Sequence, residues 1–354
     1  MAVNRYRIIE GQTLCWGILL LGAGSVLLAC SATVQQGVVQ GLALCGDVVI
    51  PALFVFLCLS YWLVESGGGF ALSVVLHPLF RLLFAGCAHG GIAFLLTLIG
   101  GYPMGAATLA GMKSQGVLCE KQVQGMALFL CCPSPAFAVT AVGVGMLGSF
   151  QAGVLLWCTC AFSTLLITVV GCRFVKGDGE TVPLSYKKQD QPLTRGVVSA
   201  CQTMLHICAV VILFRVVCSF VEWLPFFDGI KPLLFGLAEV TNGCASATHK
   251  GLPFLAAVMG FGGLGAHLQI KGILSESMPP YPWYFLLRLG QGALCYGIAA
   301  GLCAWFPQVV STFSANQGMQ VTTHSWLPSV ALVLTCMVFL GWLDPALKIR
   351  GVER

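Results

Sequence analysis

The segment Phe94–Lys113 reads FLLTLIGGYPMGAATLAGMK, with glycines and a proline in the middle of a stretch long enough to enter a membrane. A second segment, Phe254–Ile273, reads FLAAVMGFGGLGAHLQIKGI and matches the first at a constant offset of 160 residues, so that Gly100 pairs with Gly260. Backbone that unwinds against lipid leaves N–H and C=O groups unpaired, so such breaks belong where protein or a water-filled cavity surrounds them. A matched pair of interrupted apolar segments therefore indicates the binding site of a transporter.

The composition of the whole chain indicates a multi-pass membrane protein. Hydrophobic residues make up 57% of the sequence and charged residues only 9%, whereas soluble domains carry about 25% charged residues. The 18 cysteines have no metal-binding or disulfide-framework spacing, and we expect them to be small apolar packing residues. No nucleotide-binding loop, GxSxG or HExxH motif is present. We therefore expect neither ATP-driven pumping nor an enzyme, and no cofactor or metal.

Apolar stretches of about 20 residues predict transmembrane helices along the chain. These stretches are 12–31, 43–65, 122–149, 151–171, 196–222, 282–306 and 326–345. The first is expected to be a membrane helix rather than a cleaved signal peptide. The segments 70–112 and 230–275 fit re-entrant hairpins or broken helices better than plain spans.

Five regions follow from this pattern. They are an N-terminal transmembrane helix (1–35), a first repeat (36–172), a basic cytoplasmic linker (173–195), a second repeat (196–310) and a C-terminal helix with a basic tail (311–354).

The two repeats are predicted to have opposite orientations in an all-α membrane fold. Ala43–Glu65 matches Ala200–Glu222 at an offset of 157. The basic N-terminus and linker are cytoplasmic by the positive-inside rule, so the first of these helices runs inward and the second outward. This arrangement is an inverted-topology repeat. One conflict is the basic C-terminus, with Lys348 and Arg350, because strict inversion places it outside.

The first of four candidate substrate-binding clusters contains Gly101, Tyr102, Pro103 and Gly105. Proline removes a backbone donor and glycine tolerates non-helical angles, so we expect the helix to break here. A broken helix exposes N–H groups at a new N-terminus, which favours an anion. Close glycine packing between helices is the alternative explanation.

The second cluster lies inside the predicted span 122–149. Ser134 and Pro135 belong to the sequence CCPSPAF, in which two prolines flank a serine. The prolines are expected to interrupt the helix and to free carbonyl groups near the middle of the membrane. A simple kink is the alternative.

The third cluster combines an acid, a hydroxyl and an amide at Glu239, Thr241 and Asn242. Carboxylates inside a membrane are costly and usually face a pathway or a partner. Glu239 is therefore the candidate for a coupling proton or cation, and Thr241 and Asn242 for substrate contacts. If the hairpin is shallow, Glu239 is only interfacial.

The fourth cluster is Gly263, His267 and Gln269 in the second interrupted segment. His267 is expected to protonate near neutral pH and to pair with an anionic substrate, unless a neighbouring carbonyl satisfies it. Because this segment carries His267 and Gln269, we expect it to supply more of the polar recognition than the first.

Two arginines also lie in predicted spans. Arg215 is central in 196–222, where a cation is expensive unless it faces a cavity or a counter-charge. Pairing with Glu239 and pairing with an anionic substrate are both open. Arg288 lies near the start of 282–306, so it is expected to reach the membrane interface and ranks lower.

Four ordered motifs, GGYPMGA, PSPAF, EVTNG and FGGLGAHLQ, resemble those of the YlbJ-type sporulation integral membrane proteins over roughly residues 43–305. The resemblance implies two copies of the nucleoside-recognition gate domain and an architecture similar to that of concentrative nucleoside transporters. It also implies movement of dipicolinate from the mother cell to the forespore across the outer forespore membrane. Cys131 and Cys132 stand where the family has polar residues, including asparagine, so a substrate contact is not carried over to these two positions.

The expected function is that of a secondary transporter or facilitator for a small organic anion, dipicolinate. Its two carboxylates would suit two facing helix N-termini helped by Arg215 or His267. The expected partners are this anion and the lipid bilayer, with no nucleic acid, and a homo-oligomer is left open. Two alternatives remain, a nucleoside or nucleobase carrier and a structural or assembly protein of the spore envelope.

Overall fold

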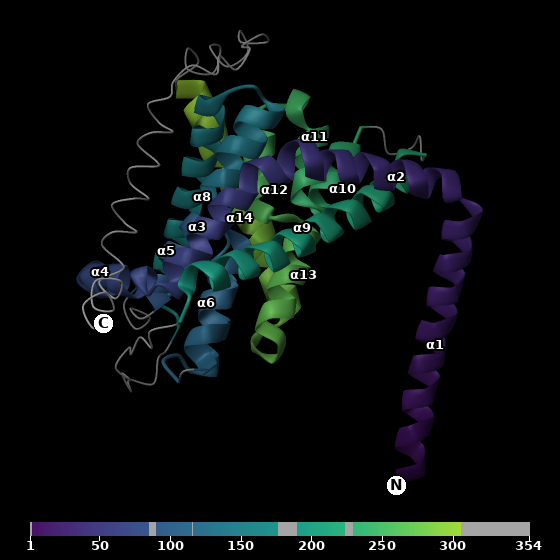
Figure 1. Ribbon diagram of the computed structural model, residues 1–354, viewed down its shortest axis with the longest axis horizontal. Coiled ribbons are helices and arrows are strands. Elements are labelled where there is room, and N and C mark those ends of the chain that lie inside the picture. The colour runs from purple at the N-terminus through teal and green to yellow at the C-terminus, as the bar shows by residue number, and fades with distance from the viewer. Residues whose placement is uncertain (1, 85–89, 115, 176–189, 224–228, 306–354) are drawn as a thin grey trace, which may run out of the picture. The chain divides into compact units, whose positions relative to one another are not determined.

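A computed structural model of the chain describes residues 2–84, 90–114, 116–175, 190–223 and 229–305, all without a β-strand (Figure 1). Within these residues, five helical segments are long and apolar enough to cross a membrane. They are Ser31–Glu65, Phe150–Gly171, Pro192–Glu222, Leu252–Ser277 and Tyr281–Trp305. The chain is therefore a multi-pass helical membrane protein, as its composition predicts. The predicted span 326–345 and the basic tail lie outside the described residues.

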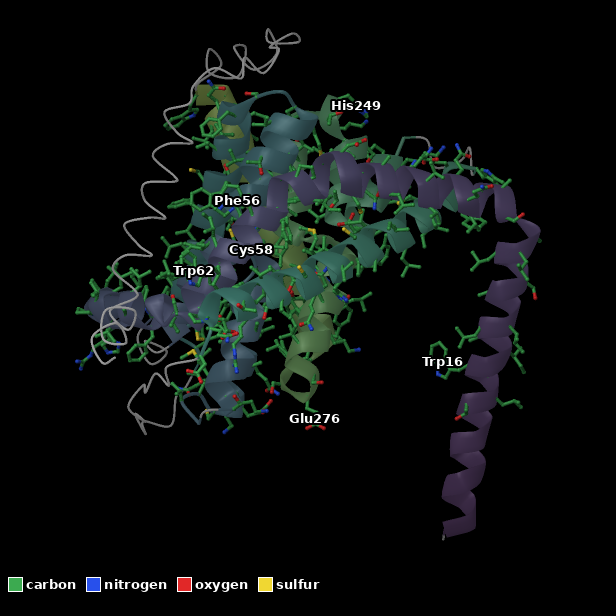
Figure 2. The ribbon with its side chains drawn as sticks, in the orientation of Figure 1. Trp16, Phe56, Cys58, Trp62, His249 and Glu276 are labelled. Atoms are coloured by element: carbon green, nitrogen blue, oxygen red, sulfur yellow. The ribbon has the colours of Figure 1, made fainter. Side chains whose placement is uncertain are left out.

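The N-terminal helices expose large apolar side chains. Helix α1 covers Ala2–Ala29, and α2 (Ser31–Leu44), the π-helical turn η1 (Cys45–Val49) and α3 (Ile50–Glu65) form one continuous segment. Trp16 of α1 is 65% exposed and Phe56 of α3 is 46% exposed (Figure 2). Exposed apolar surface of this kind is unfavourable in water and is expected where lipid covers it.

Small residues bring α2 against α9 (Pro192–Glu222). A Cβ atom added to Gly37 would lie 2.9 Å from Cα of Val216, and one added to Gly41 would lie 2.9 Å from Cα of Ile212. These two glycines, four residues apart on one helix face, let the two backbones approach closely, which is how membrane helices commonly associate.

The first interrupted segment is a hairpin. Following α4 (Gly68–Phe84), α5 (Gly91–Gly100) and α6 (Tyr102–Ser114) are separated by Gly101, whose φ of 83° only glycine adopts readily. A Cβ on Gly105 would collide with Oγ1 of Thr97. Eight residues span about 12 Å in a straight helix, so the chain must fold back at Gly101. We call α5 and α6 hairpin 1.

A second hairpin consists of α10 (Lys231–Ala238) and α11 (Val240–Ser246). A Cβ on Gly243 would collide with Cα of Gly236, so these two short helices also pack against each other. The chain turns at Glu239, which is extended with φ −155° and ψ 134°. We call this pair hairpin 2.

Two further helices are interrupted without folding back. Broken helix 1 consists of α7 (Glu120–Phe129), a non-helical stretch 130–134 and, after Pro135, the π-helical η3 (Ala136–Met146). Broken helix 2 consists of α12 (Leu252–Phe261) and α13 (Gly263–Leu274), interrupted at Gly262 with φ 86°. The predicted span 122–149 is thus not one continuous helix, because its prolines interrupt it.

The order of elements repeats along the chain. Hairpin 1, broken helix 1 and α8 (Phe150–Gly171) are followed, after α9, by hairpin 2, broken helix 2 and α14 (Tyr281–Trp305). Short 3-10 turns follow α11 at η5 (Thr248–Lys250) and α13 at η6 (Ser275–Ser277). The sequence match at an offset of 160 therefore pairs a hairpin with a broken helix. Both segments are interrupted at glycine, but the first is the hairpin of its set and the second is the broken helix of its set.

Candidate functional site

A cavity lies where the tips of both hairpins meet the breaks of both broken helices. The empty space in and around it, including open solvent at its mouth, is about 550 Å³. Leu53 and Leu57 of α3 and Ile207 of α9 form the apolar part of its wall. The tips and breaks supply the rest: Gly100, Gly101, Tyr102, Pro103, Ser134, Phe137, Glu239, Val240, Thr241, Ala266 and Gln269.

The structure brings about half of the predicted site residues to this cavity, from all four predicted clusters. Those that line it are Gly101, Tyr102, Pro103, Ser134, Glu239, Thr241 and Gln269. Those that do not are Gly105, Pro135, Arg215, Asn242, Gly263 and His267.

Glu239 is a buried carboxylate that caps the N-terminus of α11. The residue is 4% exposed, so it is buried within the protein. Oε1 accepts hydrogen bonds from the N–H and the hydroxyl of Thr241, both at 2.9 Å. Oε2 accepts from the N–H of Asn242 at 2.8 Å and from its Nδ2 at 3.0 Å. These four hydrogen bonds hold the carboxyl group in place at the cavity wall.

Asn242 and Gly263 support hairpin 2 from outside the cavity. Nδ2 of Asn242 also donates to the carbonyl of Val211, 3.1 Å away, which ties the hairpin to α9. Gly263 has φ 72°, and a Cβ there would lie 2.7 Å from the backbone nitrogen of Val240. The missing side chain lets broken helix 2 touch the tip of hairpin 2.

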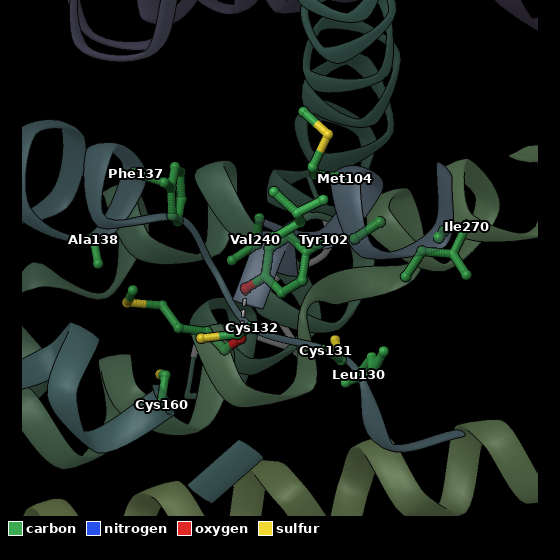
Figure 3. Packing of buried hydrophobic residues seen from close by; sticks show 14 of the residues in the cluster. Tyr102, Met104, Leu130, Cys131, Cys132, Phe137, Ala138, Cys160, Val240 and Ile270 are labelled. Carbon is green, nitrogen blue, oxygen red and sulfur yellow. Dashed lines mark hydrogen bonds between the residues drawn. The ribbon is translucent and has the colours of Figure 1, made fainter. Parts of the chain in front are cut away.

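Tyr102 joins hairpin 1 to broken helix 2. Its hydroxyl donates to the carbonyl of Met259 in the last turn of α12 at 2.6 Å (Figure 3). A Cβ on Gly262 would be 3.4 Å from the tyrosine ring. The tyrosine therefore satisfies one of the carbonyl groups that the break in this helix leaves without an intrahelical donor.

Ser134 and Pro135 begin the second part of broken helix 1. The hydroxyl oxygen of Ser134 accepts from the N–H of Phe137 at 3.1 Å, and Pro135 immediately precedes the helical residues of η3. A Cβ on Gly101 would lie 3.0 Å from the backbone nitrogen of Ser134, so hairpin 1 rests on this break. Gly105, by contrast, serves the internal packing of hairpin 1.

Arg215 binds neither Glu239 nor the cavity. Its Nη2 donates to Glu222 at 2.8 Å, and its Nε donates to Oε1 of Gln40 at 2.9 Å. Arg215 and Glu222 are seven residues apart and so share one face of α9, and α2 lies alongside with Gln40. The pairing with Glu239 considered from the sequence is not formed.

His267 is satisfied by a carbonyl, the alternative that the sequence left open. It is buried, with Nε2 3.0 Å from the carbonyl oxygen of Phe261 and its ring 5.0 Å from that of Tyr284. The break of broken helix 2 leaves the Phe261 carbonyl without an intrahelical partner, and His267 is one turn into the next helix. This explains why the imidazole lies away from the cavity.

Arg288 and Gln291 of α14 are two further buried polar residues, and the sequence motifs did not point to Gln291. Neither has any exposed surface, so Arg288 is not extended toward a lipid headgroup region but packed inside the protein. Nη2 of Arg288 donates to the carbonyl of Leu128, and Nε2 of Gln291 donates to that of Cys131 at 2.7 Å. Their spacing of three residues, which puts both on one face of an apolar helix, was the available signal.

A polar contact joins the far ends of α6, α7 and α13. Lys113 forms an ion pair with Glu120, and its Nζ lies 2.6 Å from the hydroxyl of Ser277. The hydrogen bond and the charge from Lys113 lower the pKa of the exposed Glu120 carboxyl.

The electrostatics of the cavity are set by Glu239. No lysine, arginine or histidine is among the residues that line it. In the part of the chain that the structure describes, no group of three His, Cys, Asp or Glu side chains is arranged to hold a metal ion.

These features define a class, the multi-pass helical membrane proteins with an internal site built where helices are interrupted. A comparison with curated proteins is more specific. The chain is similar to the sporulation integral membrane protein YlbJ of Bacillus subtilis (strain 168), with 24% identity over 313 residues that cover 75% of this chain and 76% of that protein. The similarity supports the YlbJ-type assignment that the motifs predict. No family model and no solved structure matches the chain.

Proposed function

We propose that this protein is a sporulation membrane transporter or facilitator whose substrate binds in the cavity between the hairpin tips and the helix breaks. The observation that supports this most directly is the convergence of four separate motifs on one cavity. Broken helices that line a cavity offer backbone groups to a solute at the depth of the membrane. Two repeats in opposite orientations, moving past each other, would expose the cavity to each side in turn.

The substrate that we propose is dipicolinate, moved from mother cell toward forespore, as the resemblance to YlbJ-type proteins implies. Tyr102 and Phe137 give the cavity aromatic surface for a flat ring. Ser134 and Gln269 offer a hydroxyl and an amide for hydrogen bonds to carboxylates.

The charge of the cavity adds a condition to this proposal. A dianion beside a buried carboxylate, with no lining cation, is electrostatically unfavourable in a low-dielectric site. Cations therefore enter together with dipicolinate, and Glu239 is the residue that binds the coupling proton.

A nucleoside or nucleobase is the second candidate substrate. The absence of a cation among the residues that line the cavity favours it. A neutral solute needs no compensating cation, and Glu239, Ser134 and Gln269 provide the acceptors and donors that sugar hydroxyls or base edges require. A structural or assembly protein of the spore envelope, in contrast, would bind none of these solutes.

The test is thermal stabilisation of the purified protein by a panel of solutes, followed by uptake into proteoliposomes. The panel contains dipicolinate, uridine, adenine and isophthalate, which has the two carboxylates but lacks the ring nitrogen. A ligand present at 100 times its Kd adds about 2.7 kcal/mol to the free energy of unfolding, so the unfolding temperature rises measurably. We expect stabilisation and uptake with dipicolinate. Stabilisation by uridine alone selects the nucleoside carrier, and a flat response to the whole panel contradicts both transport proposals.

A further inference from the structure

Helix α14 presents a buried polar face to broken helix 1. Tyr284, Arg288 and Gln291 fall at helical spacing, and none has exposed side-chain surface. A buried arginine inside a membrane bundle is expensive and usually marks a functional element. The other features of this face show which element it serves.

The groups that this face contacts are two carbonyls that have no helical donor at the break: that of Leu128, because α7 ends at Phe129, and that of Cys131. In a continuous helix the carbonyl of Cys131 would accept from the residue four positions on, but that residue is Pro135, which has no N–H. Gln291 of α14 supplies the missing donor at 2.7 Å, and the hydroxyl of Thr164 of α8 supplies another at 2.9 Å. Arg288 does the same for Leu128 in the last turn of α7.

Arg288 is poorly explained as a device for stability. Its Nε and Nη1 have no hydrogen-bond partner within the described residues, and its guanidinium lies over the ring of Tyr284 at 5.3 Å. The described salt bridges include no partner for it. A buried cation with two unpaired N–H groups carries a desolvation cost that one hydrogen bond and a ring contact only partly offset, so stability alone does not account for an arginine here.

We infer that Arg288 and Gln291 are positioning residues for the transport site. They hold the carbonyls of Leu128 and Cys131, which fixes the position of the non-helical stretch 130–134. That stretch carries Ser134, which lines the cavity and on which hairpin 1 rests. The two residues touch no substrate and act through the backbone. That these residues matter for transport rests on the proposed function. That they hold the break of broken helix 1 does not depend on it.

The experiment measures how well the break is held, without any substrate. Cys131 and Cys132 lie in the break and are fully buried, so maleimide reaches them only when the break opens. N-ethylmaleimide is used to label purified wild type and the variants Arg288→Met, Arg288→Lys and Gln291→Met. The control is Leu289→Met, because Leu289 is exposed on the same helix. Peptide mass spectrometry then gives the labelling rate at each cysteine.

Arg288→Met and Gln291→Met should raise labelling at Cys131 and Cys132 about tenfold, because each removes a hydrogen bond that closes the break. Arg288→Lys keeps a cationic donor and should stay near wild type, as should Leu289→Met. Dipicolinate should then bind the two methionine variants more weakly, with the same maximal uptake rate. Unchanged labelling in both methionine variants overturns the inference. If Arg288→Met does not accumulate, Gln291→Met alone decides. Raised labelling without any dipicolinate binding by wild type leaves the positioning role intact and contradicts only the proposed substrate.

Discussion

At the scale of single residues, the main charged group of the cavity is the carboxyl group of Glu239, which caps the N-terminus of α11. The two oxygens of Glu239 accept four hydrogen bonds from Thr241 and Asn242 at the start of α11. That helix end is therefore occupied and is not free to bind a substrate carboxylate. Arg215 and His267 are also engaged elsewhere, so under the proposed function dipicolinate would need to bring its own compensating charge.

Glu239→Gln tests this at the residue itself. Protonation of Glu239 removes a negative charge from the cavity, so uptake of dipicolinate by wild type should speed up as the donor side becomes more acidic. The neutral glutamine should abolish this dependence. It also loses two acceptor positions, which costs about 1–3 kcal/mol of stability. Uptake is measured in proteoliposomes under imposed pH gradients.

The control is Glu222→Gln, which removes a carboxylate that pairs with Arg215 away from the cavity. It should retain the response to the gradient. If Glu239→Gln responds to the gradient as wild type does, Glu239 does not bind the coupling proton.

At the scale of elements, glycine and proline chemistry decides where helices are interrupted. Gly101, Gly262 and Gly263 all have positive φ, and in broken helix 1 Pro133 lies within the non-helical stretch 130–134 and Pro135 directly follows it. Local chemistry of this kind is readable in a sequence, which is why the interruptions were predicted at the right places.

Valine at the hairpin tip and at the break tests these positions. Gly101→Val and Gly263→Val force a β-branched residue into a positive φ and toward backbone atoms at 3.0 and 2.7 Å. We expect each to lower the free energy of unfolding by about 1–3 kcal/mol and to abolish stabilisation by ligand. Gly111→Val and Gly272→Val, on α6 and α13 with open space around them, should change stability little. Equal losses in all four variants, measured by thermal unfolding, would show that the breaks are not special.

The tertiary contacts between helices could not be predicted from the sequence. Whether an interrupted segment folds back depends on contacts such as that between Thr97 and Gly105, so the alignment at an offset of 160 paired a hairpin with a broken helix. The partners of Arg215 and His267 were likewise set by helix packing. Arg288 was expected at the interface because it lies near the start of a predicted span. Its actual partner, the carbonyl of Leu128, lies 160 residues earlier in the chain, and position within a span cannot predict such a contact.

At the scale of the whole molecule, the two hairpins and the two broken helices converge on one cavity. The long segment of α2 and α3 and the helix α9 pack together and complete its apolar wall. We propose that the two sets of hairpin, broken helix and long helix are inverted repeats, since this would place the hairpin tips at equivalent depths from the two membrane faces. We propose that solute binds in this cavity.

The most direct test is equilibrium binding of radiolabelled dipicolinate to purified protein whose cavity has been filled. Ala266 lines the cavity and is nearly buried, so Ala266→Met places a longer side chain in the space for solute. Ala293→Met, exposed on α14, is the matched control. We expect wild type and Ala293→Met to bind dipicolinate alike, and Ala266→Met, while folded, to bind at least about tenfold more weakly, a loss of about 1.4 kcal/mol. Equal binding by all three proteins would contradict the proposal.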